Sequence, residues 1–164
     1  MASLILLVSL SLAFLCTSQA DLIDDVCKKA LNPSFCTQVL RSDSRSRGAD
    51  LRGLGLIIVE KSKVDVNDAL SVAKSVKNNG NKEIIDTCVE TFSESIDNLN
   101  ECSELLKKFN RGLISDLQTK GSTALTDAGT CDDEFGSREP PKLKTVSRKA
   151  QDLIDILLAI ANSF

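Results

Sequence analysis

The chain has 164 residues, a formal net charge of −3 from 20 basic and 23 acidic residues, and no histidine, tryptophan or tyrosine. Without histidine it lacks the commonest general base and metal ligand, and without tryptophan or tyrosine it lacks the usual aromatic platforms of small-ligand sites. Basic residues are scattered among acidic ones and form no stripe suited to nucleic acid. These features argue against an enzyme, and we expect no cofactor, metal or nucleic-acid partner.

The first 20 residues have the pattern of a secretory signal peptide. An apolar run over residues 4–16 precedes Ser18 and Ala20, the small residues that a signal peptidase recognises. The run is shorter than the about 20 apolar residues of a membrane-spanning helix, and no later segment is a candidate. We therefore expect a secreted, extracellular protein that starts near Asp21 and forms one domain over residues 21–164, without a membrane partner.

The N-terminal part of the mature chain, residues 21–48, has the pattern of a helical hairpin. A first short helix ends at Asn32-Pro33, because proline disfavours helical backbone at the residue before it. Ser34 is the expected cap of a second short helix, which runs through Arg41. The polar residues that follow, up to Gly48, form a connector.

From residue 49 onward, apolar residues recur at three- and four-residue spacing, which is typical of amphipathic helices. The spacing predicts long helices over residues 49–77, 82–109, 113–128 and from about Thr145 onward, and the third has an alternative end at Phe135. Segments rich in Asn, Gly or Pro separate them: Asn78–Asn81, Asn110–Gly112 and Gly136–Pro141. The predicted fold is all-α, an up-down-up-down four-helix bundle over residues 49–164 with the hairpin as an extension.

The inward faces of these helices predict the core. On the first two they are Leu51, Leu54, Ile58, Val66, Ala69, Leu70, Ala73, Val76, Ile85, Cys88, Val89, Phe92, Ile96, Leu99, Cys102, Leu106 and Phe109. On the last two they are Leu117, Gly121, Ala124, Leu125, Ala128, Val146, Ala150, Leu153, Leu157 and Ile160 or Ala161. A lipid-binding cavity between the helices is the alternative use of these faces.

Five of the six cysteines follow the signal peptide, so at least one stays unpaired. Local geometry favours a bridge between Cys27 and Cys36 across the hairpin turn. Cys88 and Cys102 lie on one helix face, roughly 21 Å apart, so they cannot bond to each other, and Cys131 pairs with one of them. Cys102 lies on an apolar stripe, which favours a buried free thiol over a reactive or partner-linking one.

Four segments resemble signature blocks of the plant invertase and pectin methylesterase inhibitor family. They are Cys27-Lys-Lys-Ala-Leu-Asn-Pro-Ser-Phe-Cys36, Asp50-Leu-Arg-Gly-Leu-Gly-Leu56, Ile85-Asp-Thr-Cys-Val-Glu-Thr-Phe92 and Thr130-Cys-Asp-Asp-Glu-Phe135. Their order and spacing extend over essentially the whole mature chain. The resemblance implies a four-helix bundle with an N-terminal hairpin, disulfides Cys27–Cys36 and Cys88–Cys131, and Cys102 as a free thiol.

The resemblance also implies a place for contact with a target enzyme. Invertase inhibitors of the family carry a Pro-Lys-Phe motif near the link between the second and third bundle helices, where it reaches the invertase active site. Residues 107–109, Lys-Lys-Phe, are the nearest match here and lack the proline. The candidate contacts are Lys107, Lys108, Asn110 and Arg111, because a cation presented there can pair with glycosidase carboxylates. A cationic end that serves only the helix dipole is the alternative.

The function implied by the resemblance is a secreted inhibitor that acts in the plant cell wall and blocks an enzyme's active-site cleft in a one-to-one complex. Invertase, a β-fructofuranosidase, is the first expected target, because the chain looks most similar to the invertase-inhibitor subgroup that includes pollen allergens. Pectin methylesterase is the second. A non-inhibitory, allergen-like structural protein and a helical lipid carrier are further alternatives. The acidic run Asp132-Asp133-Glu134 is expected to be solvated or capping rather than catalytic.

Overall fold

The computed structural model describes residues 22–164, and the expected signal peptide lies outside this range. The described chain is helical and contains no strand. After a helical stretch over residues 22–27, its elements are α2 (Pro33–Ser42), η1 (Ser44–Ser46), α3 (Leu51–Ser75), α4 (Lys82–Lys107), η2 (Arg111–Leu113), α5 (Ile114–Phe135), η3 (Gly136–Arg138) and α6 (Pro141–Ala161).

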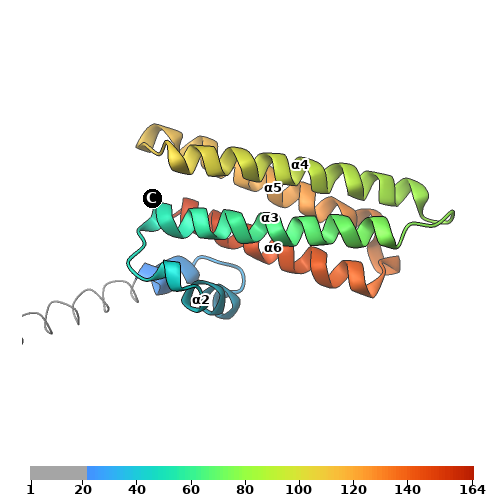
Figure 1. The fold of residues 1–164 in the computed structure, drawn as a ribbon, viewed down its shortest axis with the longest axis horizontal. Helices are drawn as coiled ribbons and strands as arrows, with labels where there is room; N and C mark the ends of the chain where they lie inside the picture. Colours follow the sequence, from blue (N-terminus) through green and yellow to red (C-terminus); the bar gives the residue numbers. More distant parts are fainter. Residues whose placement is uncertain (1–21) are drawn as a thin grey trace, which may run out of the picture.

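The four long helices form an antiparallel bundle (Figure 1). Each packs on its neighbour in the chain, α3 on α4, α4 on α5 and α5 on α6, and α6 closes the ring by packing on α3. Short links turn the chain at each end, so the predicted up-down-up-down topology is confirmed. Among the described residues, no helix is both long and apolar enough to cross a membrane.

The N-terminal hairpin lies against the α3–α6 side of the bundle, away from α4 and α5 (Figure 1). Two long-range hydrogen bonds attach it to α6 and the residues after it. The Lys29 ammonium donates to the backbone carbonyl of Asn162 at 2.8 Å, and the Leu31 backbone N–H donates to Asp155 Oδ2 at 2.7 Å. The hairpin therefore covers one side of the bundle and leaves α4 and α5 open to solvent.

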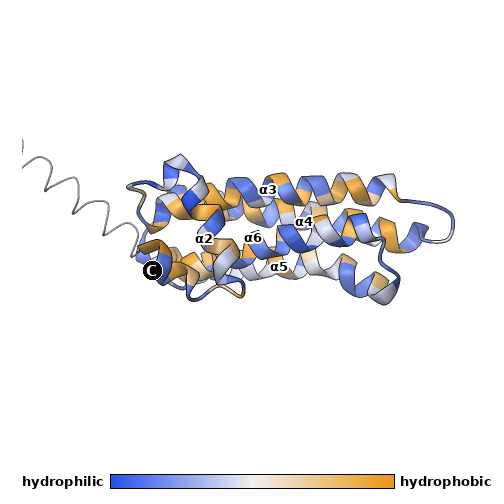
Figure 2. Cartoon of the chain, turned by 90° about the horizontal axis from the view of Figure 1, so that it is seen from below, coloured by the Kyte–Doolittle hydropathy of each residue, from blue (hydrophilic) through white to orange (hydrophobic). Residues whose placement is uncertain are grey.

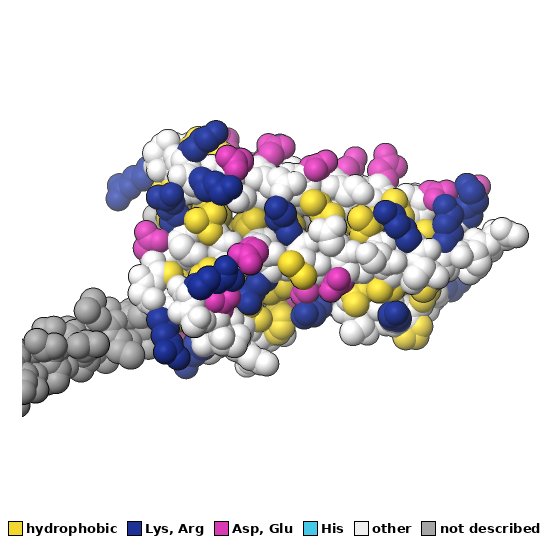
Figure 3. Space-filling model, viewed as in Figure 1, with side chains coloured by type: hydrophobic (Ala, Val, Ile, Leu, Met, Phe, Trp, Pro, Cys, Tyr) yellow, Lys and Arg dark blue, Asp and Glu magenta, His cyan; other side chains and the backbone are white. Residues whose placement is uncertain are grey.

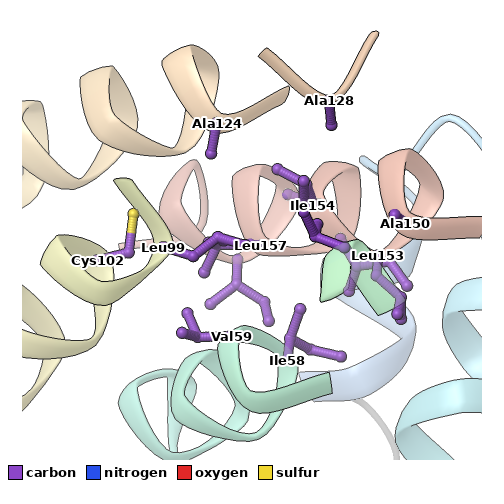
Figure 4. Close-up of a cluster of buried hydrophobic side chains, with 14 of the residues drawn as sticks. Ile58, Val59, Leu99, Cys102, Ala124, Ala128, Ala150, Leu153, Ile154 and Leu157 are labelled. Atoms are coloured by element: carbon purple, nitrogen blue, oxygen red, sulfur yellow. The ribbon is translucent and has the colours of Figure 1, made fainter. Parts of the chain in front are cut away.

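Side chains from all four long helices meet in one core (Figure 4). The labelled members are Ile58 and Val59 of α3, Leu99 and Cys102 of α4, Ala124 and Ala128 of α5, and Ala150, Leu153, Ile154 and Leu157 of α6. α5 is paler than its neighbours in the hydropathy view because it is rich in Ser, Thr and Gly, whose hydropathy is close to zero (Figure 2). At Gly55 of α3, an added Cβ would lie only 3.0 Å from Leu106 Cδ1, so α3 and α4 pack closely there.

Two helix starts differ from the prediction, and both involve proline. α2 is capped by Asn32, whose Oδ1 accepts the Phe35 N–H at 3.2 Å, and not by Ser34. α6 starts at Pro141 rather than near Thr145, because proline has the backbone angle of a first helical residue and needs no partner for the N–H that it lacks. Pro33 and Pro141 are therefore the first residues of their helices, and each also disfavours helical backbone at the residue before it.

Two disulfides hold the fold together, and their pairs are those that the family resemblance implies. Cys27–Cys36 closes the hairpin with a Cα–Cα distance of 5.5 Å, and Cys88–Cys131 joins α4 to α5 with a Cα–Cα distance of 4.7 Å. In a loop-entropy estimate, bridges of these spans stabilise the fold by about 2.7 and about 4 kcal/mol. Cys102 is unpaired and buried.

α5 reaches Phe135, the longer of its two predicted ends. It stops at Gly136, whose φ of 56° lies in the left-handed region that glycine adopts without strain. The additional turns carry Cys131 and Asp132 into the interior, where both are buried. The expected Gly136–Pro141 linker is therefore short and contains the η3 turn.

Candidate protein-binding surface

The four candidate contact residues come together at the link between α4 and α5, at the end of the bundle that also carries the C-terminus (Figure 1). Lys107 is the last residue of α4 and Lys108 is its C-cap, while Asn110 caps the η2 turn that Arg111 begins. The Asn110 side chain accepts the Gly112 N–H at 2.9 Å. All four candidate residues are exposed.

The two lysines of this link are partly neutralised by one carboxylate. Lys107 Nζ lies 2.9 Å from Glu104 Oε1, and Lys108 Nζ lies 4.0 Å from Glu104 Oε2. The hydrogen bond from Lys107 is the main cause that lowers the pKa of Glu104. Within residues 22–164, Arg111 has no carboxylate at ion-pair distance, so its charge is the most available of the three cations.

Phe109 packs against the C-terminal residue of the chain and not in the core. α4 ends two residues earlier than predicted, so Phe109 lies in the link and is only partly buried. Its ring stacks on Phe164 with a centroid distance of 4.2 Å and an interplanar angle of 28°. This corrects the expectation that Phe109 is an inward-facing helix residue. Phe109, the aromatic residue of the nearest Pro-Lys-Phe match, is therefore engaged in a contact within the chain.

Sequence reasoning missed a row of carboxylates along the outer face of α4. It consists of seven exposed residues at three- and four-residue spacing, which places them on one helix face; we call it the acidic ridge, Glu83, Asp86, Glu90, Glu94, Asp97, Glu101 and Glu104. Figure 3 shows acidic side chains following the upper edge of the molecule, where α4 lies. The three- and four-residue spacing of these acidic residues is the sequence signal that marks the ridge.

Ion pairs occupy the two ends of the acidic ridge and leave its middle open. Asp86 binds Lys77 and Lys82 near the start of α4, and Glu101 pairs with Lys120 of α5 at 2.8 Å. In the described chain no Lys or Arg lies at ion-pair distance from the central residues Glu90, Glu94 and Asp97. The middle of α4 therefore presents uncompensated negative charge.

Beside the acidic ridge, α5 offers a nearly uncharged face of small hydroxyl side chains. A shallow open depression of about 490 Å³ lies over it, lined by Gln118, Thr119, Ser122, Thr123 and Thr126. The threonine hydroxyls donate to backbone carbonyls four residues earlier, for example Thr123 to Thr119 at 3.0 Å. Because the hydroxyl donors are already hydrogen-bonded within the helix, burying these side chains under a protein partner carries only a small desolvation penalty.

The acidic run at the end of α5 is not uniformly solvated. Asp133 and Glu134 are exposed, but Asp132 is only 8% exposed and caps no helix. Its carboxylate accepts hydrogen bonds from Ser147 Oγ at 2.6 Å and Gln151 Nε2 at 3.1 Å. Asp132 is therefore part of a buried polar cluster, which corrects the expectation of a solvated or capping residue. Nothing in the spacing of α5 and α6 marks these partners in advance.

Cys102 has the surroundings of an inert thiol. It is fully buried in the core, between α4 and its neighbours (Figure 4). Burial, aided by the negative charge of Glu101, raises the pKa of the thiol to about 12. Since the thiolate is the nucleophilic form, this cysteine is not poised for chemistry.

Together these features define a class of protein: a helical bundle stapled by two disulfides, which offers a rigid surface for another macromolecule. Residues 21–160 match the family described as plant invertase/pectin methylesterase inhibitor. The chain belongs to this family, whose members inhibit enzymes and are not enzymes themselves.

Individual relatives agree with this assignment. The chain is 33% identical to a pectinesterase inhibitor of Actinidia deliciosa, over 86% of this chain and 78% of that protein. A cell wall/vacuolar inhibitor of fructosidase from Arabidopsis thaliana is 23% identical, over 87% of this chain and 69% of that protein. Among solved structures, a mutant form of a pectin methylesterase inhibitor from Arabidopsis superimposes with a TM-score of 0.74 at 27% identity, covering 85% of this chain and 95% of that one.

Proposed function

We propose that this protein is a secreted inhibitor of pectin methylesterase in the plant cell wall, which acts by covering the enzyme's active-site cleft in a one-to-one complex. The observation that carries the choice of target is the 33% identity to a pectinesterase inhibitor over most of both chains. The likeness to a solved pectin methylesterase inhibitor supports it. A bundle pre-organised by two disulfides loses little conformational entropy on binding, as an inhibitor requires.

The α4–α5 side supplies the proposed contact face. The hairpin packs on the α3–α6 side of the bundle and leaves α4 and α5 uncovered along their length (Figure 1). The open middle of the acidic ridge fits a target surface with positive charge, and the hydroxyl face of α5 lies next to it. A standard interface of about 800 Å² per partner fits on two such helices.

The direct test is titration of the disulfide-bonded protein against purified plant pectin methylesterase and cell-wall invertase, in parallel, at mildly acidic pH. We expect loss of pectin methylesterase activity that is complete at one inhibitor per enzyme, with invertase unaffected. If a known inhibitor blocks each enzyme while this protein blocks neither, the proposed function is wrong.

A double variant tests the contact face. Glu90→Gln with Glu94→Gln removes two unpaired charges from the acidic ridge, and we expect inhibition to weaken by about tenfold, equivalent to about 1.4 kcal/mol of binding energy. The matched control is Asp25→Asn with Glu134→Gln, which makes the same change in net charge on exposed residues outside the ridge. Equal effects of the two pairs would assign the loss to net charge rather than to the α4–α5 face.

Invertase is the second candidate target, and two observations favour it. The fructosidase inhibitor resembles this chain over most of its length, and the α4–α5 link presents the exposed cation Arg111. Against it, the link has no proline, and Phe109 is stacked on Phe164. Loss of invertase activity alone in the parallel titration would establish this alternative.

A further inference from the structure

Two buried carboxyl groups, those of Asp132 and Glu139, interact inside the end of the bundle that lies away from the hairpin (Figure 1). Asp132 belongs to the last turn of α5, and Glu139 follows the η3 turn, just before α6. Each residue is only 8% exposed. The turn thus folds back so that a second acidic side chain is buried beside the first.

The Asp132 carboxylate is surrounded by hydrogen-bond donors, whereas one carboxyl oxygen of Glu139 has none within residues 22–164. Asp132 accepts from Ser147 and Gln151, as described above, and Arg148 Nε lies 2.8 Å from its Oδ2. These three donors suit a carboxylate, which can only accept. By contrast, Glu139 Oε1 is buried and has no hydrogen-bond partner among the described residues.

A proton on Glu139 explains how this carboxyl can be buried beside Asp132. Burial first, and then the charge of Asp132 and a hydrogen bond with it, raise the pKa of Glu139 to about 7. The charged groups that face Glu139 are Asp132 of α5 and the cations Lys144 and Arg148 of α6, and the two cations oppose the rise. A neutral carboxyl can donate to Asp132, whereas two carboxylates have no donor between them and repel.

We propose that Asp132 and Glu139 hold one proton between them and form a pH-sensitive latch that fastens the η3 turn and the start of α6 to α5. With the proton in place, Glu139 donates to Asp132 and the turn is closed. When the proton leaves to solvent, two negative charges face each other in a buried site, compensated only by Lys144 and Arg148. The η3 turn and the first turn of α6 then loosen.

The direction of the pH dependence follows from linkage. In the unfolded chain Glu139 has an ordinary pKa of about 4.3, and in the folded chain its pKa is about 7. Between these values the folded state binds the additional proton, so the stability that the latch contributes is present below about pH 4.3 and is lost as the pH rises to about 7. The latch therefore contributes most to stability in acidic solution.

The experiment is thermal unfolding of the disulfide-bonded protein from pH 4.5 to 8, for the wild type and Glu139→Gln. Glutamine is permanently neutral and can donate to Asp132, so the variant should lose the pH dependence of the latch. We expect the wild-type Tm to fall by about 5 °C more than that of the variant between pH 5 and pH 8. The exposed neighbour Glu134→Gln is the matched control and should keep the wild-type slope.

A carboxyl-carbon NMR titration reports on the same group without unfolding. The glutamate resonance that is absent from Glu139→Gln should titrate with a midpoint near pH 7. A midpoint near the ordinary value of about 4.3, or a wild-type slope retained in Glu139→Gln, would overturn the latch. Neither measurement involves a target enzyme, so the result is independent of the proposed inhibitory function.

Discussion

The role of each buried polar side chain in this protein depends on whether it has a hydrogen-bond partner. The Ser95 hydroxyl, on the inner face of α4, donates to the Ala124 carbonyl of α5 at 2.8 Å, and so serves as a contact between the two helices. The Cys102 thiol, on the same helix, is fully buried in the apolar core. A buried group without charge compensation keeps its neutral form, and for a thiol this means loss of reactivity.

Cys102 should accordingly be unreactive toward thiol reagents in the folded protein. With its pKa near 12, only on the order of one thiol in ten thousand is ionised at pH 8. We expect no reaction with Ellman's reagent in the native state, and one reactive thiol per mature chain in denaturant without reductant. Cys102→Ala should abolish the signal in both states. Rapid labelling of the native protein would show that the thiol is accessible and that its burial is wrong.

Side-chain caps begin the elements in the first part of the described chain, α2, η1 and α3, whereas α4, α5 and α6 have none. Asp50 caps α3 by accepting the Gly53 N–H at 2.7 Å. Asp43 caps the η1 turn in the same way and also binds Arg45 and Lys61, and these bonds, led by the one from Arg45, hold its pKa well below the usual range. Both caps lie where the hairpin joins the bundle, so they set the entry of the chain into α3.

Removing the cap of α3 should cost stability without changing the fold. Asp50→Ala leaves the Gly53 N–H without its acceptor, and we expect unfolding free energy to fall by about 1 kcal/mol. Asp50→Asn keeps an acceptor oxygen and should lie within a few tenths of a kcal/mol of the wild type. Urea unfolding measures both. Equal losses in the two variants would mean that the charge of Asp50, rather than its hydrogen bond, stabilises α3.

At the scale of the whole molecule, charge is distributed unevenly although the net value is small. The acidic ridge follows α4 on one side, while the cations of the α4–α5 link lie at the end of the same helix (Figure 3). The hairpin occupies the opposite side of the bundle (Figure 1). A net charge of −3 therefore conceals a long negative surface, which can guide a positively charged partner.

If the ridge guides association, salt should slow the encounter with the target enzyme. Raising ionic strength from about 0.01 to 0.15 M shortens the screening length from about 30 to 8 Å, and we expect the association rate constant to fall at least several-fold with little change in dissociation. Stopped-flow or surface-binding kinetics would measure it. Salt-independent association would assign recognition to shape instead of charge.

Local spacing was sufficient to predict the four helices and their order. The stripe from Ile85 to Leu106 recurs at three- and four-residue steps, and such a stripe is stable only when other helices bury it. The location of the α4–α5 link also followed from its Asn and Gly residues. Helix ends were less accurate, because a side-chain cap such as that of Asn32 competes with equally plausible neighbours.

The remaining features depend on residues that are distant in the chain, and periodicity carries no information about them. Phe109 lies in the α4–α5 link, outside the predicted core, and stacks on Phe164, which is distant in the chain. Asp132 was buried because Ser147 and Gln151 of α6 supply its donors. The acidic residues of α4 form a pattern in the sequence, but only the packing of the bundle shows that no basic side chain or other element of the described chain covers the middle of this row.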